Sequence, residues 1–320
     1  PRVTTSSLDA LRAYSDAGAA WRRGKYDDGL AGWRRAVELD PEFALAHAEL
    51  GSALASHVVT RLADARTHFE KALAFADRTT EREHLLIQAR FHSAMGHNDD
   101  ALRIYDAYLQ TWPDDIHAQF NRASEHLRAK RWAEAVPGFE QVLRIDSSNA
   151  SAVINIATCY RGLGKFSNAL RYYDRAFQLE PSWVALGNLN HEYGFTLVGA
   201  GNLAKARQVL SLGLEKPDSR FRALRSLALL DLYQGQYRAA AAKLREAILV
   251  ESKPELALNR AREHLFLSIV REGQGNRSED WRELDEAHKS LSAAQPAVWL
   301  LLRIGALYAR AGAPDKAATL

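Results

Sequence analysis

The sequence predicts an all-α protein built as a solenoid of antiparallel helix pairs. Apolar residues recur with the period of an α-helix along nearly the whole chain. Short glycine-containing breakers, such as "RGLGKF" at 161–166, separate the two helical segments of a pair. The same spacing returns from one pair to the next. This internal repeat overrides the two-domain estimate that a length of 320 residues would otherwise suggest.

The helical segments follow one another as eight complete pairs and a truncated ninth. Residues 1–7 are polar and are expected to form a linker, with Ser6 or Ser7 as the first N-cap. Residues 8–320 are expected to form a single solenoid. The predicted pairs are 8–23 with 27–39, 44–57 with 62–75, 81–95 with 99–111, 115–129 with 132–145, the two segments of 151–181, 182–199 with 203–215, 219–234 with 237–250, 255–272 with 278–290, and a last pair that begins at 296.

Two columns of residues support this register. Midway along each first helix the residue is small: Ala17, Gly51, Ala89, Ala123, Ala157, Gly194, Ala228, Ser268 and Gly305. Within each complete second helix a bulky residue recurs: Trp33, Phe69, Tyr105, Phe139, Tyr173, Leu210, Leu244 and Leu284. Small residues let paired helices cross closely, and large ones fill the adjacent space. Because one pair cannot bury its apolar face alone, the pairs are expected to stack.

The stretch 151–181 carries the pattern most completely. Its residues at fixed offsets are Val153, Ile156, Ala157, Tyr160, Ala169, Tyr173 and Pro181. This spacing resembles the tetratricopeptide repeat, W-x2-L-G-x2-Y, then A-x3-F, then P. The resemblance implies a right-handed superhelix whose first helices line a concave face. It also implies a non-catalytic scaffold that binds an extended peptide or a partner helix in that concave groove.

The start of the chain has a narrower resemblance. The segment "VTTSSLDALRAYSDAG" is followed by "WRRGKYDDGLAGWRRAVELDPEFALAHAELG". Together they are similar to the C-terminal repeat region of some bacterial serine/threonine kinases, with relatives fused to winged-helix regulators. The resemblance implies a bacterial signalling parent whose kinase module lies outside this sequence, with the array as its sensor or docking region. The array would then be either cytoplasmic or the extracytoplasmic region of a membrane-anchored parent. Because the chain opens without methionine and stops within a helical pattern, we expect a fragment of a longer protein.

Composition argues against several other classes of partner. The 42 basic and 39 acidic residues nearly balance, which does not indicate binding to nucleic acid. No apolar run reaches the length of a membrane span. Cys159 is the only cysteine and is expected to be a buried, inert thiol.

Motifs for catalysis, cofactors or metals are weak. His84, His92 and His97 form the densest histidine set, but their spacing lacks the i, i+4 geometry of a helical zinc pair. The "GLGKF" at 162–166 lacks the full spacing of a phosphate-binding loop. We therefore expect no metal, no cofactor and no catalytic residue. An enzyme would require convergent polar residues in the groove.

The groove is the expected site of function. The predicted peptide-binding residues are Arg90, Phe120, Asn121, Asn155, Arg161, Arg222, Arg225 and Arg262. Asn121 and Asn155 stand at the same position in consecutive repeats and resemble the asparagine ladder of O-linked N-acetylglucosamine transferase arrays, where amides hold a peptide backbone. The neighbouring repeats depart from this ladder with Ile87 and Glu192.

Two alternatives concern the groove arginines and the ends of the array. The arginines present forked donors that suit an acidic or carboxylate-ended peptide, or they are solvated or paired with local acids. A structural role is the other functional class, in which the parent self-associates, as a homodimer, through exposed terminal helices.

Overall fold

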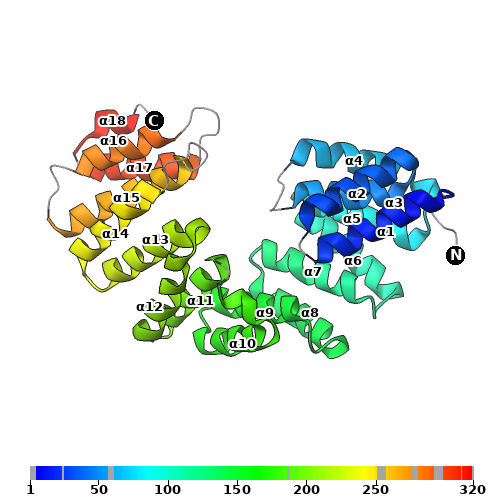
Figure 1. Ribbon diagram of the computed structural model, residues 1–320, viewed down its shortest axis with the longest axis horizontal. Helices are drawn as coiled ribbons and strands as arrows, with labels where there is room; N and C mark the ends of the chain where they lie inside the picture. The colour runs from blue at the N-terminus through cyan, green and yellow to red at the C-terminus, as the bar shows by residue number, and fades with distance from the viewer. Residues whose placement is uncertain are drawn as a thin grey trace. The chain divides into compact units, whose positions relative to one another are not determined.

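The computed structural model describes residues 5–23, 25–56, 61–185, 187–250, 257–275, 280–291, 298–310 and 312–318. Every regular element in these ranges is a helix, which confirms the predicted all-α class (Figure 1). The chain forms two compact units, Pro1–Leu163 and Gly164–Leu320. The boundary falls between the two helices of the predicted fifth pair. The single solenoid over 8–320 stays a prediction.

The first unit consists of antiparallel helix pairs in chain order. Its helices are α1 (Leu8–Arg22), α2 (Tyr26–Leu39), α3 (Ala44–Ala55), α4 (Leu62–Ala74), η1 (Ala76–Arg78), α5 (Glu81–Ala94), α6 (Asn98–Thr111), α7 (Ile116–Arg128), α8 (Trp132–Ile145) and α9 (Ala150–Gly162). Each odd-numbered helix up to α7 packs mainly on the even-numbered helix that follows it. In addition, α3 packs on α5, and α7 packs on α9. In these two cases, first helices of neighbouring pairs therefore touch.

The second unit has the same organisation. Its helices are α10 (Phe166–Leu179), η2 (Pro181–Ala185), α11 (Gly187–Gly199), α12 (Leu203–Ser211), η3 (Leu212–Glu215), α13 (Pro217–Tyr233), α14 (Tyr237–Val250), α15 (Ala257–Gly273), α16 (Asp280–Ser290), α17 (Val298–Arg310) and α18 (Pro314–Ala318). The pairs α11 with α12, α13 with α14, α15 with α16 and α17 with α18 pack closely.

The small and bulky columns meet where the helices of a pair cross. A Cβ atom placed on Gly51 of α3 would lie 2.9 Å from the Cδ2 atom of Phe69 in α4. Gly194 of α11 has the same relation to Leu210 of α12. Both bulky side chains are buried, and the small residues allow this close approach. At these two crossings the predicted packing is confirmed.

The beginning of the chain is anchored to the first pair. The Oγ atom of Ser7 accepts a hydrogen bond from the backbone of Ala10, so Ser7 is the N-cap of α1. The hydroxyl of Thr5 donates to Asp40, and Thr5 is buried. The part of the predicted linker that the structure describes is thus fixed to the fold. Residues 1–4 lie outside the described ranges.

Candidate functional site

A groove of about 630 Å³, lined by both polar and apolar groups, lies in the first unit. Helices α3, α5 and α7 supply most of its wall, and α4 and α6 add one residue each. Its lining residues are Glu49, Ser52, Ala55, Ser56, Leu62, Arg90, Ser93, Ala94, Tyr105, Asn121 and Arg128. Most of them come from the C-terminal halves of three first helices, so we name this site the α3–α5–α7 groove. Helix α3 packs on α5, and Arg128 of α7 bonds Ser93 of α5.

Arg90 of α5 lies in the groove as predicted, and it is paired there. Its Nη1 atom donates to the Oε1 atom of Glu49 in α3 at 2.5 Å. About a quarter of each side chain is exposed. The negative charge of Glu49 raises the pKa of Arg90, so the guanidinium stays charged. Arg90 therefore lies in the groove, as predicted, and is also paired with a local acid.

Asn121 of α7 lies in the same groove. It is the sixth residue of its helix, as Glu49 is of α3. Its side chain hydrogen-bonds the hydroxyl of Tyr105, which is almost fully buried, and burial raises the pKa of Tyr105. The bond to a neutral, fixed phenol orients the amide, which can both donate to and accept from a peptide backbone.

Arg128, the last residue of α7, is a groove residue that the sequence prediction missed. Its Nη2 atom donates to the Oγ atom of Ser93 at 2.8 Å, and its guanidinium pairs with the buried carboxylate of Glu125. Burial lowers the pKa of Arg128. A cation in the last turn of a helix is usually explained by the helix dipole, so Arg128 does not stand out when its repeat is read alone. Comparison with Ser56 and Ala94, which hold the corresponding positions of α3 and α5, would have pointed to it.

The remaining predicted residues of the first unit lie outside the lining of this groove. Phe120 of α7 packs edge-to-face on Phe139, with ring centroids 5.4 Å apart. Asn155 and Arg161 lie half-buried on α9. The groove thus unites Arg90 and Asn121 from the predicted set. Ile87, which interrupts the asparagine ladder, is a core residue with 1% exposure.

The three predicted arginines of the second unit have different surroundings. Arg222 is exposed, and its guanidinium lies 5.5 Å from the ring centre of Phe221. Arg225 is buried and pairs with Glu263 of α15. Arg262 is half-buried on α15. The guanidinium of Arg225 is thus enclosed with its acid and is not accessible to a ligand.

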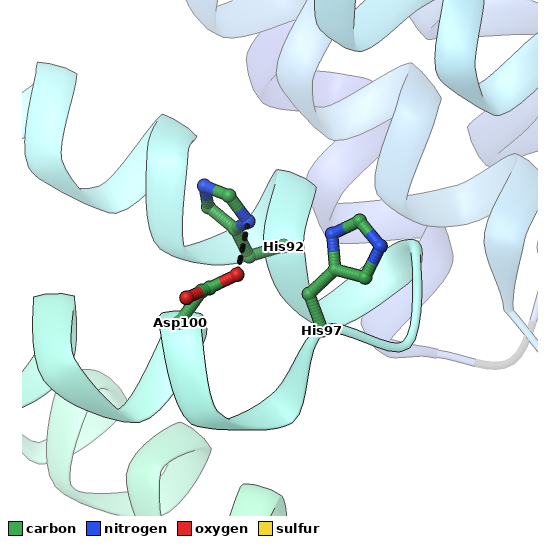
Figure 2. A group of neighbouring side chains, drawn as sticks. All are labelled: His92, His97 and Asp100. Carbon is green, nitrogen blue, oxygen red and sulfur yellow. Dashed lines mark ion pairs between the residues drawn. The ribbon is translucent and has the colours of Figure 1, made fainter.

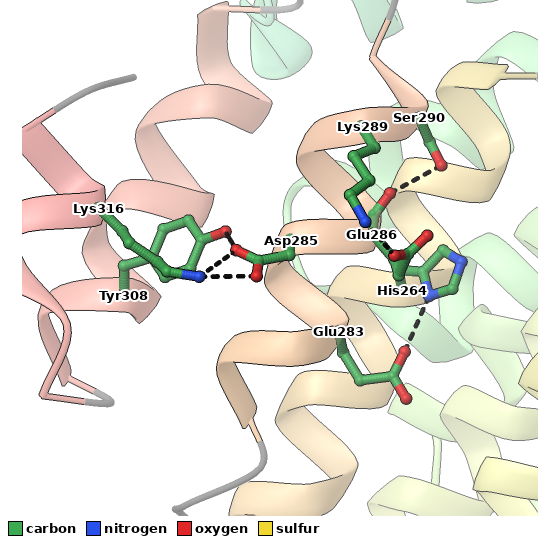
Figure 3. Close-up of polar contacts among 8 residues, drawn as sticks. All are labelled: His264, Glu283, Asp285, Glu286, Lys289, Ser290, Tyr308 and Lys316. Carbon is green, nitrogen blue, oxygen red and sulfur yellow. Dashed lines mark hydrogen bonds and ion pairs between the residues drawn. The ribbon is translucent and has the colours of Figure 1, made fainter.

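Polar side chains of α15 and α16 bind one another. The Nδ1 atom of His264 and the Oε2 atom of Glu283 lie 2.8 Å apart (Figure 3), and Arg271 donates to the other oxygen of Glu283 at 2.7 Å. All three side chains are largely buried. These contacts join α15 to α16, and this structural role accounts for the three side chains.

The predicted buried cysteine is confirmed. Cys159 lies in the core of α9, and burial raises the pKa of its thiol to about 12. The reactive thiolate is therefore disfavoured at neutral pH.

The sequence analysis considered histidine pairs on one helix. It did not consider ligands that a turn between two helices brings together. His92 and His97 lie at the junction of α5 and α6, and Asp100 follows on α6 (Figure 2). His84 stands apart and hydrogen-bonds Gln88.

Comparison with known proteins agrees with this architecture. The family model of the tetratricopeptide repeat matches residues 9–78 and 88–150, which hold every lining residue of the α3–α5–α7 groove. The chain carries tetratricopeptide repeats. A crystal structure of a tetratricopeptide repeat protein from Parabacteroides merdae covers 82% of the chain and 99% of its own, with a TM-score of 0.50 and 15% identity. That likeness supports the fold.

Two curated relatives add sequence similarity. Protein CTR9 homolog of Arabidopsis thaliana is 31% identical over 29% of this chain and 9% of its own length. Type IV pilus assembly protein PilF of Pseudomonas aeruginosa is 27% identical over 54% of this chain and 69% of its own length. The chain therefore spans a small part of the first relative. Tetratricopeptide arrays generally act as non-catalytic protein-binding scaffolds. No helix among the described residues has the length and apolarity to cross a membrane.

Proposed function

We propose that the α3–α5–α7 groove binds an extended peptide segment of a partner protein, with a carboxylate of that segment next to Arg128. The observation that carries this proposal is the convergence of Arg90, Asn121 and Arg128 from separate repeats on one open groove. Arg90 pairs with Glu49, and Arg128 pairs with the buried Glu125 behind the lining. About half of the Arg128 side chain stays exposed, so its forked donor can also reach a carboxylate of the ligand, which favours an acidic ligand.

The two arginines have different roles in this proposal. Arg90 is held by Glu49, so it shapes the wall and contributes little free charge. Arg128 pairs with Glu125 but keeps about half of its side chain exposed, and because burial lowers its pKa, an incoming carboxylate would stabilise its charged form. The amide of Asn121 would hold the backbone of the peptide between them.

The wider role we propose is docking within a bacterial signalling protein. The kinase-like start of the chain supports it, with the kinase module in the parent. The similarity to PilF, a pilus assembly protein by its name, supports a bacterial scaffold that brings other proteins together.

A peptide library screen tests the binding site. Peptides with free and amidated C-termini are displayed to the full chain, and dissociation constants of the best sequences are measured by fluorescence polarisation. Arg128→Ala and Asn121→Ala are expected to weaken binding by about tenfold each, since each removes a hydrogen-bonding partner worth about 1–1.5 kcal/mol. Arg144→Ala is the matched control because Arg144 is exposed on α8, bonds Gln141 and lies outside the groove. Equal affinities for all three variants would refute the groove as the binding site.

Self-association remains the second candidate because terminal helices expose large apolar side chains. Leu8 of α1 is 61% exposed and Leu302 of α17 is 70% exposed. Sedimentation equilibrium over a range of concentrations, with Leu302→Glu as the test variant, measures this. A monomer mass at all concentrations would exclude self-association of the chain.

A further inference from the structure

The turn between α5 and α6 brings three potential metal ligands together. One imidazole nitrogen of His92, one of His97 and one carboxylate oxygen of Asp100 all lie within 4.8 Å of one another. Figure 2 shows the three side chains coming from the last turn of α5, the connecting turn and the first turn of α6. Among the described residues, these three side chains are the group of potential metal ligands that the fold brings this close together.

The backbone of the turn explains this convergence. Gly96 has a φ of 79°, the left-handed conformation that favours glycine. The N–H of His97 donates to the carbonyl of His92 at 2.9 Å, and the N–H of Gly96 donates to the carbonyl of Ser93 at 3.1 Å. These two bonds define a Schellman motif, which brings together the side chains at the His92 and His97 positions. An apolar pair usually occupies them, whereas this turn carries two imidazoles.

Other repeats have the same turn without the same side chains. In the turn from α7 to α8, the N–H of Arg131 donates to the carbonyl of His126 at 2.8 Å, so an arginine faces the histidine position. In the turn from α11 to α12, Asn202 donates to Leu197 in the same way. The turn therefore forms without histidine, and folding alone does not account for two imidazoles at the α5–α6 turn.

The three side chains are also available. The Nδ1 atom of His92 is buried and makes no hydrogen bond with the described atoms, and it lies 3.6 Å from the Oδ2 atom of Asp100. His97 is exposed and makes no capping hydrogen bond to α6. Arg103 binds Oδ1 of Asp100, which leaves Oδ2 directed at the imidazole.

We propose that His92, His97 and Asp100 form a binding site for a divalent transition-metal ion of the zinc class. Two imidazoles and one carboxylate suit zinc and its first-row neighbours, whereas calcium and magnesium require oxygen ligands. Ligand atoms around tetrahedral zinc lie about 3.3 Å apart, given metal–ligand bonds of about 2.0–2.1 Å. His92 and Asp100 are close to that separation, and rotation of the exposed His97 ring closes the remaining gap. The fourth position would be open to water.

Arg103 acts as the outer partner of this site. A ligating carboxylate is commonly held by a second hydrogen bond that fixes its orientation, and Arg103 provides one to Asp100. The exposed face of His97 provides the entry path for the ion.

Isothermal titration of the tag-free full chain with zinc chloride, after treatment with a chelator, tests the proposal. We expect saturable binding of one ion per chain at this site. Cobalt(II) substitution should produce the visible absorption bands of a tetrahedral complex. His97→Ala removes an exposed ligand without disturbing the core, and it should weaken zinc binding by at least about tenfold and abolish the cobalt spectrum.

Two further variants locate the ion. His117→Ala removes an exposed histidine of α7 and should leave binding unchanged. His68→Ala removes one member of the other close histidine pair, in which the Nδ1 atoms of His47 and His68 lie 2.9 Å apart. It should also leave binding unchanged. The proposal is overturned if the parent shows no saturable zinc binding, if His97→Ala binds as the parent does, or if His68→Ala abolishes the binding.

Discussion

Arg225 of α13 and Glu263 of α15 form an ion pair in the interior of the second unit. The Nη1 atom of Arg225 donates to the Oε1 atom of Glu263 at 3.0 Å, and the two side chains are 10% and 0% exposed. The pair joins first helices of adjacent repeats. Arg222, one turn earlier on α13, is exposed. Two arginines that are equivalent in the sequence pattern thus have different roles.

Arg225→Ala should lower the free energy of unfolding by about 3–5 kcal/mol, because it leaves the carboxylate of Glu263 buried without its cation. Urea denaturation followed by circular dichroism measures the change. Arg222→Ala is the matched control, and a change within about 0.5 kcal/mol is expected.

Replacement of both partners separates the charge effect from loss of packing. Arg225→Met combined with Glu263→Met removes both charges and keeps apolar volume, so most of the lost stability should return. If the single variant Arg225→Ala unfolds at the same urea concentration as the parent, the pair contributes no stability and our interpretation is wrong.

The ion pairs Arg90–Glu49 and Arg225–Glu263 show which part of the structure could be predicted from the sequence. The helix pairs follow from local periodicity and glycine-containing turns, so the fold could be predicted from neighbouring residues alone. Arg90 binds Glu49 across 41 positions, and Arg225 binds Glu263 across 38. Such contacts depend on the register between stacked repeats, which no local pattern contains.

The histidines at the α5–α6 turn show a second limit of the sequence analysis. A search for ligands on one helical face tests a separation of four residues, whereas His92 and His97 are five apart and meet through the left-handed Gly96. The glycine was visible in the sequence. Its consequence for the flanking side chains follows from the hydrogen bonds of the turn.

Gly51→Leu should destabilise the first unit by about 1–3 kcal/mol, because the larger side chain would overlap the ring of Phe69. Thermal or urea denaturation measures the effect. Ala31→Leu on the exposed face of α2 adds similar volume and should change stability little. If Phe69→Leu in the Gly51→Leu background brings no recovery, the clash lies elsewhere. The buried Ala157 belongs to the same column, and Ala157→Leu should be similarly costly.

His68 should make the stability of the first unit depend on pH. The Nε2 atom of His47 lies 3.0 Å from the carbonyl of Pro41, and its Nδ1 atom faces that of His68 at 2.9 Å. If Nε2 of His47 carries a proton for Pro41, its Nδ1 accepts from His68, so the pair is satisfied when both rings are neutral. Burial lowers the pKa of His68 to about 4, with help from the nearby His47.

The sign of the pH effect follows from proton uptake. Between the ordinary value of 6.5 and about 4, the unfolded chain binds a proton at His68 that the folded chain does not. The contribution of His68 to the free energy of unfolding is therefore fully present above pH 6.5 and is lost as the pH falls toward 4. Urea denaturation at several pH values should show a smaller drop for His68→Gln than for the parent. His117→Gln, at an exposed position, should retain the parental slope, and an unchanged slope in His68→Gln would contradict the assignment.

Asp285 of α16 should hold the last two helices in place. Its carboxylate accepts a hydrogen bond from the hydroxyl of Tyr308 in α17 at 2.5 Å and bonds from Lys316 in α18 at 2.6 and 2.7 Å (Figure 3). Helix α18 has five residues and none of them is buried, so polar contacts carry much of its attachment.

Asp285→Ala should lower the free energy of unfolding by about 1–3 kcal/mol, because the hydroxyl of the buried Tyr308 loses its acceptor. Hydrogen exchange followed by mass spectrometry should show faster exchange in α17 and α18 while α13 and α14 keep their protection. Glu286→Ala is the control, since the neighbouring Glu286 pairs with the exposed Lys289, and its exchange pattern should match that of the parent. Parental exchange in Asp285→Ala would mean that apolar packing alone anchors these helices.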